Sequence, residues 1–428
     1  MGFPTYPFSL GETADRELIQ YLQTSKAFGY IESARSGIHE LHLENFGGQY
    51  KKLKDLWPLV LTDALRELKK HDPREWPEGK NFNSFFHEHS LGVTELQEVF
   101  TGFTEFEGML YGVAPDRYRD HLAHAFRVWI IGHGLLKNCF QGALSTDELD
   151  KSITEQEWEG MWAIAALCHD VGYPLAAIER INQQARTTLR NLGLTPAGDL
   201  RFAFSQQMLP FHDTIIKLIS SKPVKSNEEN KYLTHLQNKY YLKFLKSFDR
   251  LDHGIVSTLL ISKALVYFLE SDLSHDSRKP LGQEDARQFL IRREILRGIA
   301  AHTCPDIYHL KFTTFSFLLF IVDELQCWGR PTLDELQNKS EIRQSTAHVK
   351  EFTRTRINIQ IDTDDENWDD GQRKGVVSQI NRLHRMLRLA VDTPTPAPEL
   401  YLKFSIVNKN GEKGEFLLVN NEIKVLLP

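Results

Sequence analysis

The chain has 428 residues, of which 41% are hydrophobic and 25% are charged. This is ordinary globular composition, with enough apolar side chains for a large core. Its 51 lysines and arginines are outnumbered by 57 aspartates and glutamates, for a formal net charge of -6. We therefore expect no binding of long nucleic acid through a general basic surface. A small phosphorylated ligand stays compatible, because metal ions and a few local arginines can neutralise it.

The N-terminus and the cysteines bear on location. The first residues lack a basic segment followed by an apolar one, and the longest apolar run, Phe315 to Val322, is too short to span a bilayer. Four cysteines lie in apolar surroundings without paired spacing, which predicts buried free thiols in a reducing compartment. They are Cys139, Cys168, Cys304 and Cys327. We expect a cytoplasmic protein that does not contact a membrane.

The first half of the chain predicts helices. Residues 1–114 mix turns with helical stretches such as Leu53–Lys70, and Arg117–Phe140 has apolar positions at helical spacing. Thr154 followed by Glu157 is a capping box, which predicts a helix that begins there and ends near Cys168. Residues from about 196 to 250 are polar and lysine-rich, and we interpret them as an insertion between core helices.

The second half predicts three more apolar-faced helices and then a different architecture. The helices are His253–Leu269, Glu284–His302 and Phe312–Trp328. Beyond about residue 345 we expect a strand, a helix and two further strands around the turn signal Asn410-Gly411. Their ranges are Arg354–Ile361, Gly371–Leu389, Tyr401–Val407 and Glu415–Val419. The predicted fold is mainly α: an N-terminal region (1–114), a multi-helix bundle with an insertion (115–344) and a small α+β domain (345–428).

One His-Asp pair stands out from the other three in the chain. His169-Asp170 ends a hydrophobic helix, where its side chains can be held rigidly, whereas the other pairs lie in polar, loop-like stretches. An imidazole nitrogen and a carboxylate oxygen side by side can both reach one divalent cation. The dipeptide alone carries little weight, because it occurs at His71, His212 and His275 as well.

Other predicted helices each bring a polar residue into an apolar stretch. His121 and His124 share one helical face, His253 begins a helix, and His302 ends one. Asp323 interrupts a continuous apolar run, so its carboxylate must be paired, exposed or bound to a cation. Each histidine taken singly fits a hydrogen-bonded core residue. Metal binding gives one common reason for the whole set.

The order H…HD…H…H…D over residues 115–330 resembles the HD-domain superfamily of metal-dependent phosphohydrolases. LCHDVGYP is similar to the family's central motif, and VDELQCWGRP to its terminal Asp helix. The resemblance implies an HD-domain bundle in which His124, His169, Asp170 and Asp323 bind one metal. In members with two ions it adds His253 and His302.

Two features depart from the simplest members. The 82 residues between Asp170 and His253 imply an insertion, and HEHSLGV at residues 87–93 also resembles the first-helix motif. We favour His124 over His89 for the first ligand, because 45 residues separate it from His169, which fits two adjacent helices and one loop.

The implied chemistry is hydrolysis of a phosphate ester or anhydride. One or two ions of Mn, Fe, Co or Ni, bridged by Asp170, would lower the pKa of a bound water and polarise a phosphoryl oxygen, and Mg can accompany a nucleotide. His121 is our candidate general acid, with a place behind the ligands or on the surface as its alternative. Candidate phosphate contacts are Arg117, Arg119, Arg127, Lys311 and Arg330.

Three functions stay open. The chain resembles bacterial deoxynucleoside triphosphate triphosphohydrolases, which implies a nucleotide substrate, a nucleotide effector, a homo-oligomer, and a role in nucleotide-pool control such as defence against phage. DHLAHAFRV resembles the paired-histidine helix of cyclic-nucleotide phosphodiesterases, so a cyclic nucleotide or short oligonucleotide is the alternative substrate. The third function is a nucleotide sensor or scaffold without turnover.

Overall fold

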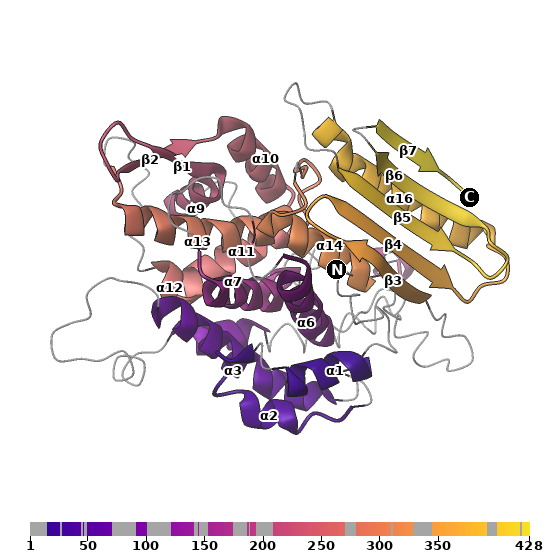
Figure 1. The fold of residues 1–428 in the computed structure, drawn as a ribbon, viewed down its shortest axis with the longest axis horizontal. Coiled ribbons are helices and arrows are strands. Elements are labelled where there is room, and N and C mark those ends of the chain that lie inside the picture. Colours follow the sequence, from indigo (N-terminus) through magenta and orange to yellow (C-terminus); the bar gives the residue numbers. More distant parts are fainter. Residues whose placement is uncertain are drawn as a thin grey trace, which may run out of the picture.

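The computed structural model describes most of the helical region and the C-terminal region. The described residues are 15–25, 28–43, 46, 49–70, 91–100, 121–140, 144, 153–173, 186–187, 189–193, 209–269, 280–309, 311–327, 345–391, 400–419 and 422–428. In this part the chain is mainly helical, with a small C-terminal β-sheet (Figure 1). The predicted fold class is confirmed at this level, whereas the domain boundaries at 115 and 345 stay predictions. His87, His89 and the Pro-rich stretch 392–399 lie outside the described residues.

The N-terminal helices pack against the central ones. They are α1 (Asp15–Thr24), α2 (Arg35–His39) and α3 (Tyr50–Lys70). The amphipathic helix α3 lies along α7 (Glu155–Cys168), and its Trp57 Nε1 donates a hydrogen bond to the Leu167 carbonyl at 3.0 Å. That carbonyl is one of the last of α7, and such carbonyls have no partner within their own helix. Trp57 thus helps to hold the end of α7, where the His-Asp pair follows.

Helix α7 begins where its capping box predicted. The Thr154 side chain accepts from the backbone N–H of Glu157, and the Glu157 carboxylate accepts from the Thr154 N–H at 2.9 Å.

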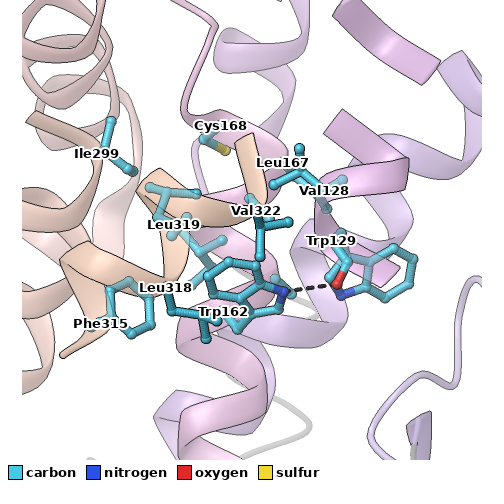
Figure 2. Close-up of a cluster of buried hydrophobic side chains, with 14 of the residues drawn as sticks. Val128, Trp129, Trp162, Leu167, Cys168, Ile299, Phe315, Leu318, Leu319 and Val322 are labelled. Carbon is cyan, nitrogen blue, oxygen red and sulfur yellow. Dashed lines mark hydrogen bonds between the residues drawn. The ribbon is translucent and has the colours of Figure 1, made fainter. Parts of the chain in front are cut away.

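The tryptophans of α7 connect it to two neighbouring helices, α6 (His121–Phe140) and α14 (Phe315–Cys327). Figure 2 shows Trp162 packed among side chains of these helices, with its Nε1 donating to the Trp129 carbonyl of α6 at 2.7 Å. The Phe315 ring of α14 contacts the rings of both Trp158 and Trp162. The core thereby fixes three helices that carry polar residues at one end.

The helix predicted over His253–Leu269 is in fact two helices, α11 (His253–Ala264) and α12 (Val266–Leu269). Leu265 between them has extended backbone angles. The N–H of Val266 donates to the carbonyl of Leu91 at 3.1 Å instead of continuing the helical ladder. The single-helix prediction was therefore wrong, because a contact distant in sequence ends α11 early. The next helix, α13 (Gln283–Ala301), agrees with its prediction to within one residue at each end.

The lysine-rich insertion has regular secondary structure where it is described. It consists of α9 (Pro210–Ser220), the antiparallel hairpin β1 (Ser221–Lys225) and β2 (Tyr232–Leu236), and α10 (Asn238–Asp249). These four elements lie together at the upper left of Figure 1, above α13. Arg297 of α13 donates to the carbonyls of Ile219 and Ser221, which fixes the hairpin to the core.

The C-terminal region is a five-stranded sheet covered by one helix. Its strand order is β3-β4-β5-β6-β7, with β4 and β5 parallel and joined by α16 (Asp370–Val391), and all other neighbours antiparallel. The strands are β3 (Ser345–Phe352), β4 (Arg356–Thr363), β5 (Tyr401–Val407), β6 (Lys413–Val419) and β7 (Glu422–Leu426). Gly411 has a φ of 80° in the turn between β5 and β6, as its Asn-Gly sequence predicted. Both edge strands, β3 and β7, were missed by the sequence prediction.

Two further predictions concerned membrane-spanning segments and the state of the cysteines. In the described part of the chain, no helix is long and apolar enough to cross a membrane. Cys168 and Cys304 are buried free thiols, as predicted, whereas Cys139 is only half-buried. The Cys327 side chain lies outside the described residues.

Because of Glu159 in α7, we expect the free energy of unfolding to fall as the pH rises from acid to neutral. Burial raises its pKa from 4.5 to about 7, although contact with Lys137 opposes the shift. The folded protein then keeps a proton that the unfolded chain releases at lower pH. The stabilisation is complete below the unfolded pKa and is lost as pH rises through about 7. In urea unfolding, the free energy of unfolding of the wild type should fall by about 1–3 kcal/mol more than that of Glu159→Gln between pH 5 and pH 8. Glu155→Gln, on the exposed partner of the same lysine, should keep the wild-type slope.

Candidate metal centre

Six side chains predicted as metal ligands come together at one end of the helical core. His169 is the C-cap residue of α7, and Asp170 follows it. The other four come from separate elements: His124 from α6, His253 from the start of α11, His302 from the end of α13, and Asp323 from α14. Each lies at a helix end or on a buried helical face, so tertiary packing fixes its position. The sequence order thus predicted a cluster that the fold assembles.

The first half of the cluster consists of His124, His169, Asp323 and one oxygen of Asp170. The two histidine Nε2 atoms are 3.2 Å apart, and His124 Nε2 is 3.0 Å from Asp323 Oδ1. Asp170 Oδ2 lies 3.5 Å from His169 Nε2 and 3.8 Å from His124 Nε2. Ligand atoms bound to one cation at about 2.1 Å with angles of about 90–110° lie roughly 3.0–3.4 Å apart. The two shorter distances fall within this range, and the two to Asp170 Oδ2 exceed it by 0.1 and 0.4 Å.

The second half shares Asp170 with the first. Its other oxygen, Oδ1, lies 3.1 Å from His253 Nε2 and 3.6 Å from His302 Nε2. In the described part of the chain, His302 Nε2 has no hydrogen-bond partner, although it is buried. A buried ring nitrogen without a partner is costly unless something binds it. A cation shared with Asp170 would satisfy it. Two sets of residues that share Asp170 could each hold a metal ion: His124, His169 and Asp170, and Asp170, His253 and His302.

Backbone and side-chain acceptors orient three of the four histidines. The Nδ1 of His169 donates to the Ala166 carbonyl at 2.8 Å, and the Nδ1 of His302 donates to the Ile299 carbonyl at 2.6 Å. The Nδ1 of His124 donates to Gln326 Oε1 at 2.6 Å. When Nδ1 carries the proton in this way, the lone pair of the neutral ring is on Nε2. All three Nε2 atoms face the carboxylates.

The electrostatics also suit a cation. Burial alone would raise the pKa of Asp170, but His169, His253 and His302 outweigh it and hold that pKa well below its ordinary value. Asp323 has a similarly lowered pKa, because His124 and His169 outweigh its burial. Both carboxylates are therefore ionised at neutral pH. Burial would lower the pKa of His169, yet the two carboxylates raise it to about 9. A metal would replace that proton.

The cluster is most open at His253. The His253 side chain is 26% exposed, compared with 11% for Asp170 and for Asp323 and 0% for His302. Tyr173 lies beside this opening, with its ring 5.4 Å from the His253 ring and 4.4 Å from that of His121. His121, our predicted general acid, is thus in contact with a residue that borders the open side. A ligand that reaches the cluster would enter from this side.

The residues predicted to contact phosphate lie in different settings. Arg127 is buried, and two of its guanidinium nitrogens donate to Asp15 at 2.7 and 2.8 Å. This geometry gives Arg127 a structural role in joining α1 to α6 and argues against the predicted substrate contact. Lys311 is exposed in the segment that leads into α14. Arg117, Arg119 and Arg330 lie outside the described residues.

Two residues of the centre were missed in the sequence. Gln326 lies one turn beyond Asp323 on α14, a spacing that makes it a neighbour on the same helical face. Ser257 of α11 accepts from the Gly172 N–H at 2.8 Å and donates to the His169 carbonyl at 2.7 Å. It therefore ties the helix that carries His253 to the turn that carries Asp170. The helical spacing could have identified Gln326, whereas nothing in the sequence marked Ser257.

Replacing Gln326 by leucine is expected to weaken metal binding about 10–100-fold, because the His124 ring loses the acceptor that fixes its tautomer. Isothermal titration with Mn²⁺ would measure the change. Gln326→Glu is the matched control, since a carboxylate oxygen can accept the same hydrogen bond and should preserve the affinity. An unchanged dissociation constant in the leucine variant would show that Gln326 does not orient His124.

Comparisons with known proteins identify no family or relative for this chain. No protein-family model, no curated protein and no solved structure matches the chain. The resemblance to HD domains accordingly rests on the motifs in the sequence and not on a relative.

Proposed function

We propose that this chain is an HD-type metal-dependent phosphohydrolase that acts on a nucleotide. The observation that carries the proposal is the position of Asp170, whose two oxygens face two different pairs of histidines. Two metal ions held in positions that share a carboxylate would together stabilise the attacking and the leaving oxygen of a phosphoryl group. Our leading substrate is a deoxynucleoside triphosphate, cleaved to a deoxynucleoside and triphosphate.

The residues of the centre have different roles in the proposed reaction. Divalent ions in the two positions would supply a Lewis acid that acidifies water and polarises a phosphoryl oxygen. The ionised Asp170 and Asp323 neutralise the positive charge of such ions in a buried setting. We assign the donation of a proton to the leaving oxygen to His121, whose ring lies beside that of Tyr173. The donor set of nitrogens and carboxylate oxygens suits Mn, Fe, Co or Ni.

Support for the nucleotide comes from the resemblance of the motifs to those of bacterial triphosphohydrolases. The same resemblance motivates a nucleotide effector and a homo-oligomer as parts of this proposal. A nucleotide also fits the opening in chemical terms, because Tyr173 offers an aromatic ring next to the candidate ions.

The test is a substrate panel with the purified full-length protein and Mn²⁺, in parallel with excess EDTA. Release of triphosphate or pyrophosphate from a deoxynucleoside triphosphate would support the leading substrate. Conversion of a cyclic nucleotide or oligonucleotide to monophosphates would support the phosphodiesterase alternative. No turnover of any substrate, together with no bound transition metal, would favour the sensor or scaffold and overturn the proposal.

A further inference from the structure

The insertion that precedes His253 carries a charge opposite to that of the whole chain. Residues 210–250 contain eight lysines and arginines but only four aspartates and glutamates, although the complete sequence has a formal net charge of -6. Positive charge is thus concentrated on α9, the β1–β2 hairpin and α10. Segregation of this kind creates a local positive potential that attracts anionic partners.

Within this insertion, α10 has a basic stripe along one face. Lys239, Lys243, Lys246 and the C-cap residue Arg250 are spaced by four, three and four residues, which places them within a narrow arc of one helical face. We call these four residues the α10 basic face. It extends over about 16 Å along the helix axis. A stacked single strand at about 3.4 Å per nucleotide covers that length with roughly five nucleotides.

The lysines of this face form no ion pair among the described residues. The pKa of Lys243 is lowered by burial and by the neighbouring Lys239 and Lys246, although the Asp306 carboxylate opposes the shift. An anion between these lysines would relieve their mutual repulsion. Most charged faces of surface helices carry both signs, which is why a stripe of one sign indicates a partner.

An aromatic side chain lies among the cations. Lys243 Nζ is 4.1 Å from the centre of the half-buried Tyr308 ring, and Lys239 Nζ donates to the Tyr308 hydroxyl at 3.2 Å. Leu242, at the border of the face, is 57% exposed. Cations interleaved with aromatic and apolar groups are typical of surfaces that bind single-stranded nucleic acid, where backbone phosphates meet lysines and bases meet rings. A simple anion would not require the rings.

The last residue of the α10 basic face, Arg250, contacts residues near the candidate metal centre. Arg250 contacts Asp252 at 2.9 Å and Asp306 at 3.4 Å. Asp252 immediately precedes His253, and Asp306 is four residues beyond His302. The basic face therefore ends next to residues that lie close in the chain to His253 and His302.

We propose that the α10 basic face binds the phosphodiester backbone of a short single-stranded nucleic acid and directs it to the metal centre. Binding by this face does not depend on the proposed function, whereas delivery of the strand for hydrolysis rests on it. The expectation that no long nucleic acid binds is unaffected, because the face is local and holds only a few nucleotides.

The test measures binding and hydrolysis separately. Fluorescence anisotropy with a labelled oligothymidylate of about ten nucleotides, in EDTA, reports binding without cleavage. The variant Lys239→Gln/Lys243→Gln/Lys246→Gln should bind on the order of tenfold more weakly and reduce the salt slope of log K by about 2, since each lost phosphate contact removes about 0.7. The control Lys374→Gln/Lys409→Gln/Lys424→Gln removes the same charge from exposed positions in the C-terminal region and should bind like the wild type.

The outcomes separate the two proposals. Equal loss in both triple variants, no binding by the wild type, or preferential binding to phosphatidylserine vesicles would overturn the proposed surface. Hydrolysis of bis(p-nitrophenyl) phosphate with Mn²⁺ tests the metal centre independently, because this small ester does not need the basic face. If oligonucleotide binding persists but neither this ester nor any substrate of the nucleotide panel is hydrolysed and no transition metal is bound, the surface stands and the proposed function fails.

Discussion

Replacing Asp170 by asparagine is expected to abolish metal binding at both candidate positions and to lower turnover by about a thousandfold or more. Asparagine has the shape of aspartate but carries no charge and presents an NH₂ group in place of one oxygen. Since each Asp170 oxygen faces a different pair of histidines, a single substitution impairs both groups. Metal content by mass spectrometry and hydrolysis of the best substrate measure the result.

Variants of single histidines provide the control for this prediction. His302→Gln should weaken only the second group, and His124→Gln only the first, so each should retain about one ion per chain. Circular dichroism would show whether each variant folds. If Asp170→Asn kept a full metal complement while either histidine variant lost it, the shared role of Asp170 would be wrong.

The candidate ligands could be identified in the sequence because each is a local exception in its own helix. His124 and Asp323 are polar residues within buried helices, and His169-Asp170 follows a hydrophobic one. Such side chains need a common partner in the core. Of the residues that orient them, Gln326 can be inferred from its helical spacing to Asp323, whereas nothing local marks Ser257. Ser257 acts only because α11 crosses the turn after α7, a contact between residues 85 positions apart in sequence.

The fold shows the same division between local and distant causes. The capping box at Thr154 and the turn at Gly411 are local signals, and both predictions hold. The break at Leu265 depends on the Leu91 carbonyl and was not predictable from periodicity. Strand β7 was missed although its polar and apolar residues alternate, because it has only five residues and lies at the edge of its sheet, where even its apolar residues are partly exposed.

Gly172 in the turn after Asp170 is expected to be indispensable for the second metal group. A Cβ at this position would lie 2.5 Å from the Ser257 backbone nitrogen and 2.7 Å from the His253 carbonyl oxygen. Both atoms belong to α11, so Gly172→Ala must push the start of that helix away from the turn. His253 Nε2 is only 3.1 Å from Asp170 Oδ1, and a shift of about 1 Å at such a site costs on the order of a hundredfold in rate.

The measurement is the affinity for a second Mn²⁺ ion together with kcat/KM. We expect Gly172→Ala to lose the second ion and most of its activity while the first group keeps its metal, and to lose about 1–3 kcal/mol of stability through overpacking. Gly375→Ala in α16 is the matched control. Its Cβ would meet nothing within 4 Å, so the change should leave activity unaltered and stabilise the helix by about 0.5–1 kcal/mol. Full activity of Gly172→Ala would mean that α11 and the turn need not approach so closely, and His253 would then lose its place among the ligands.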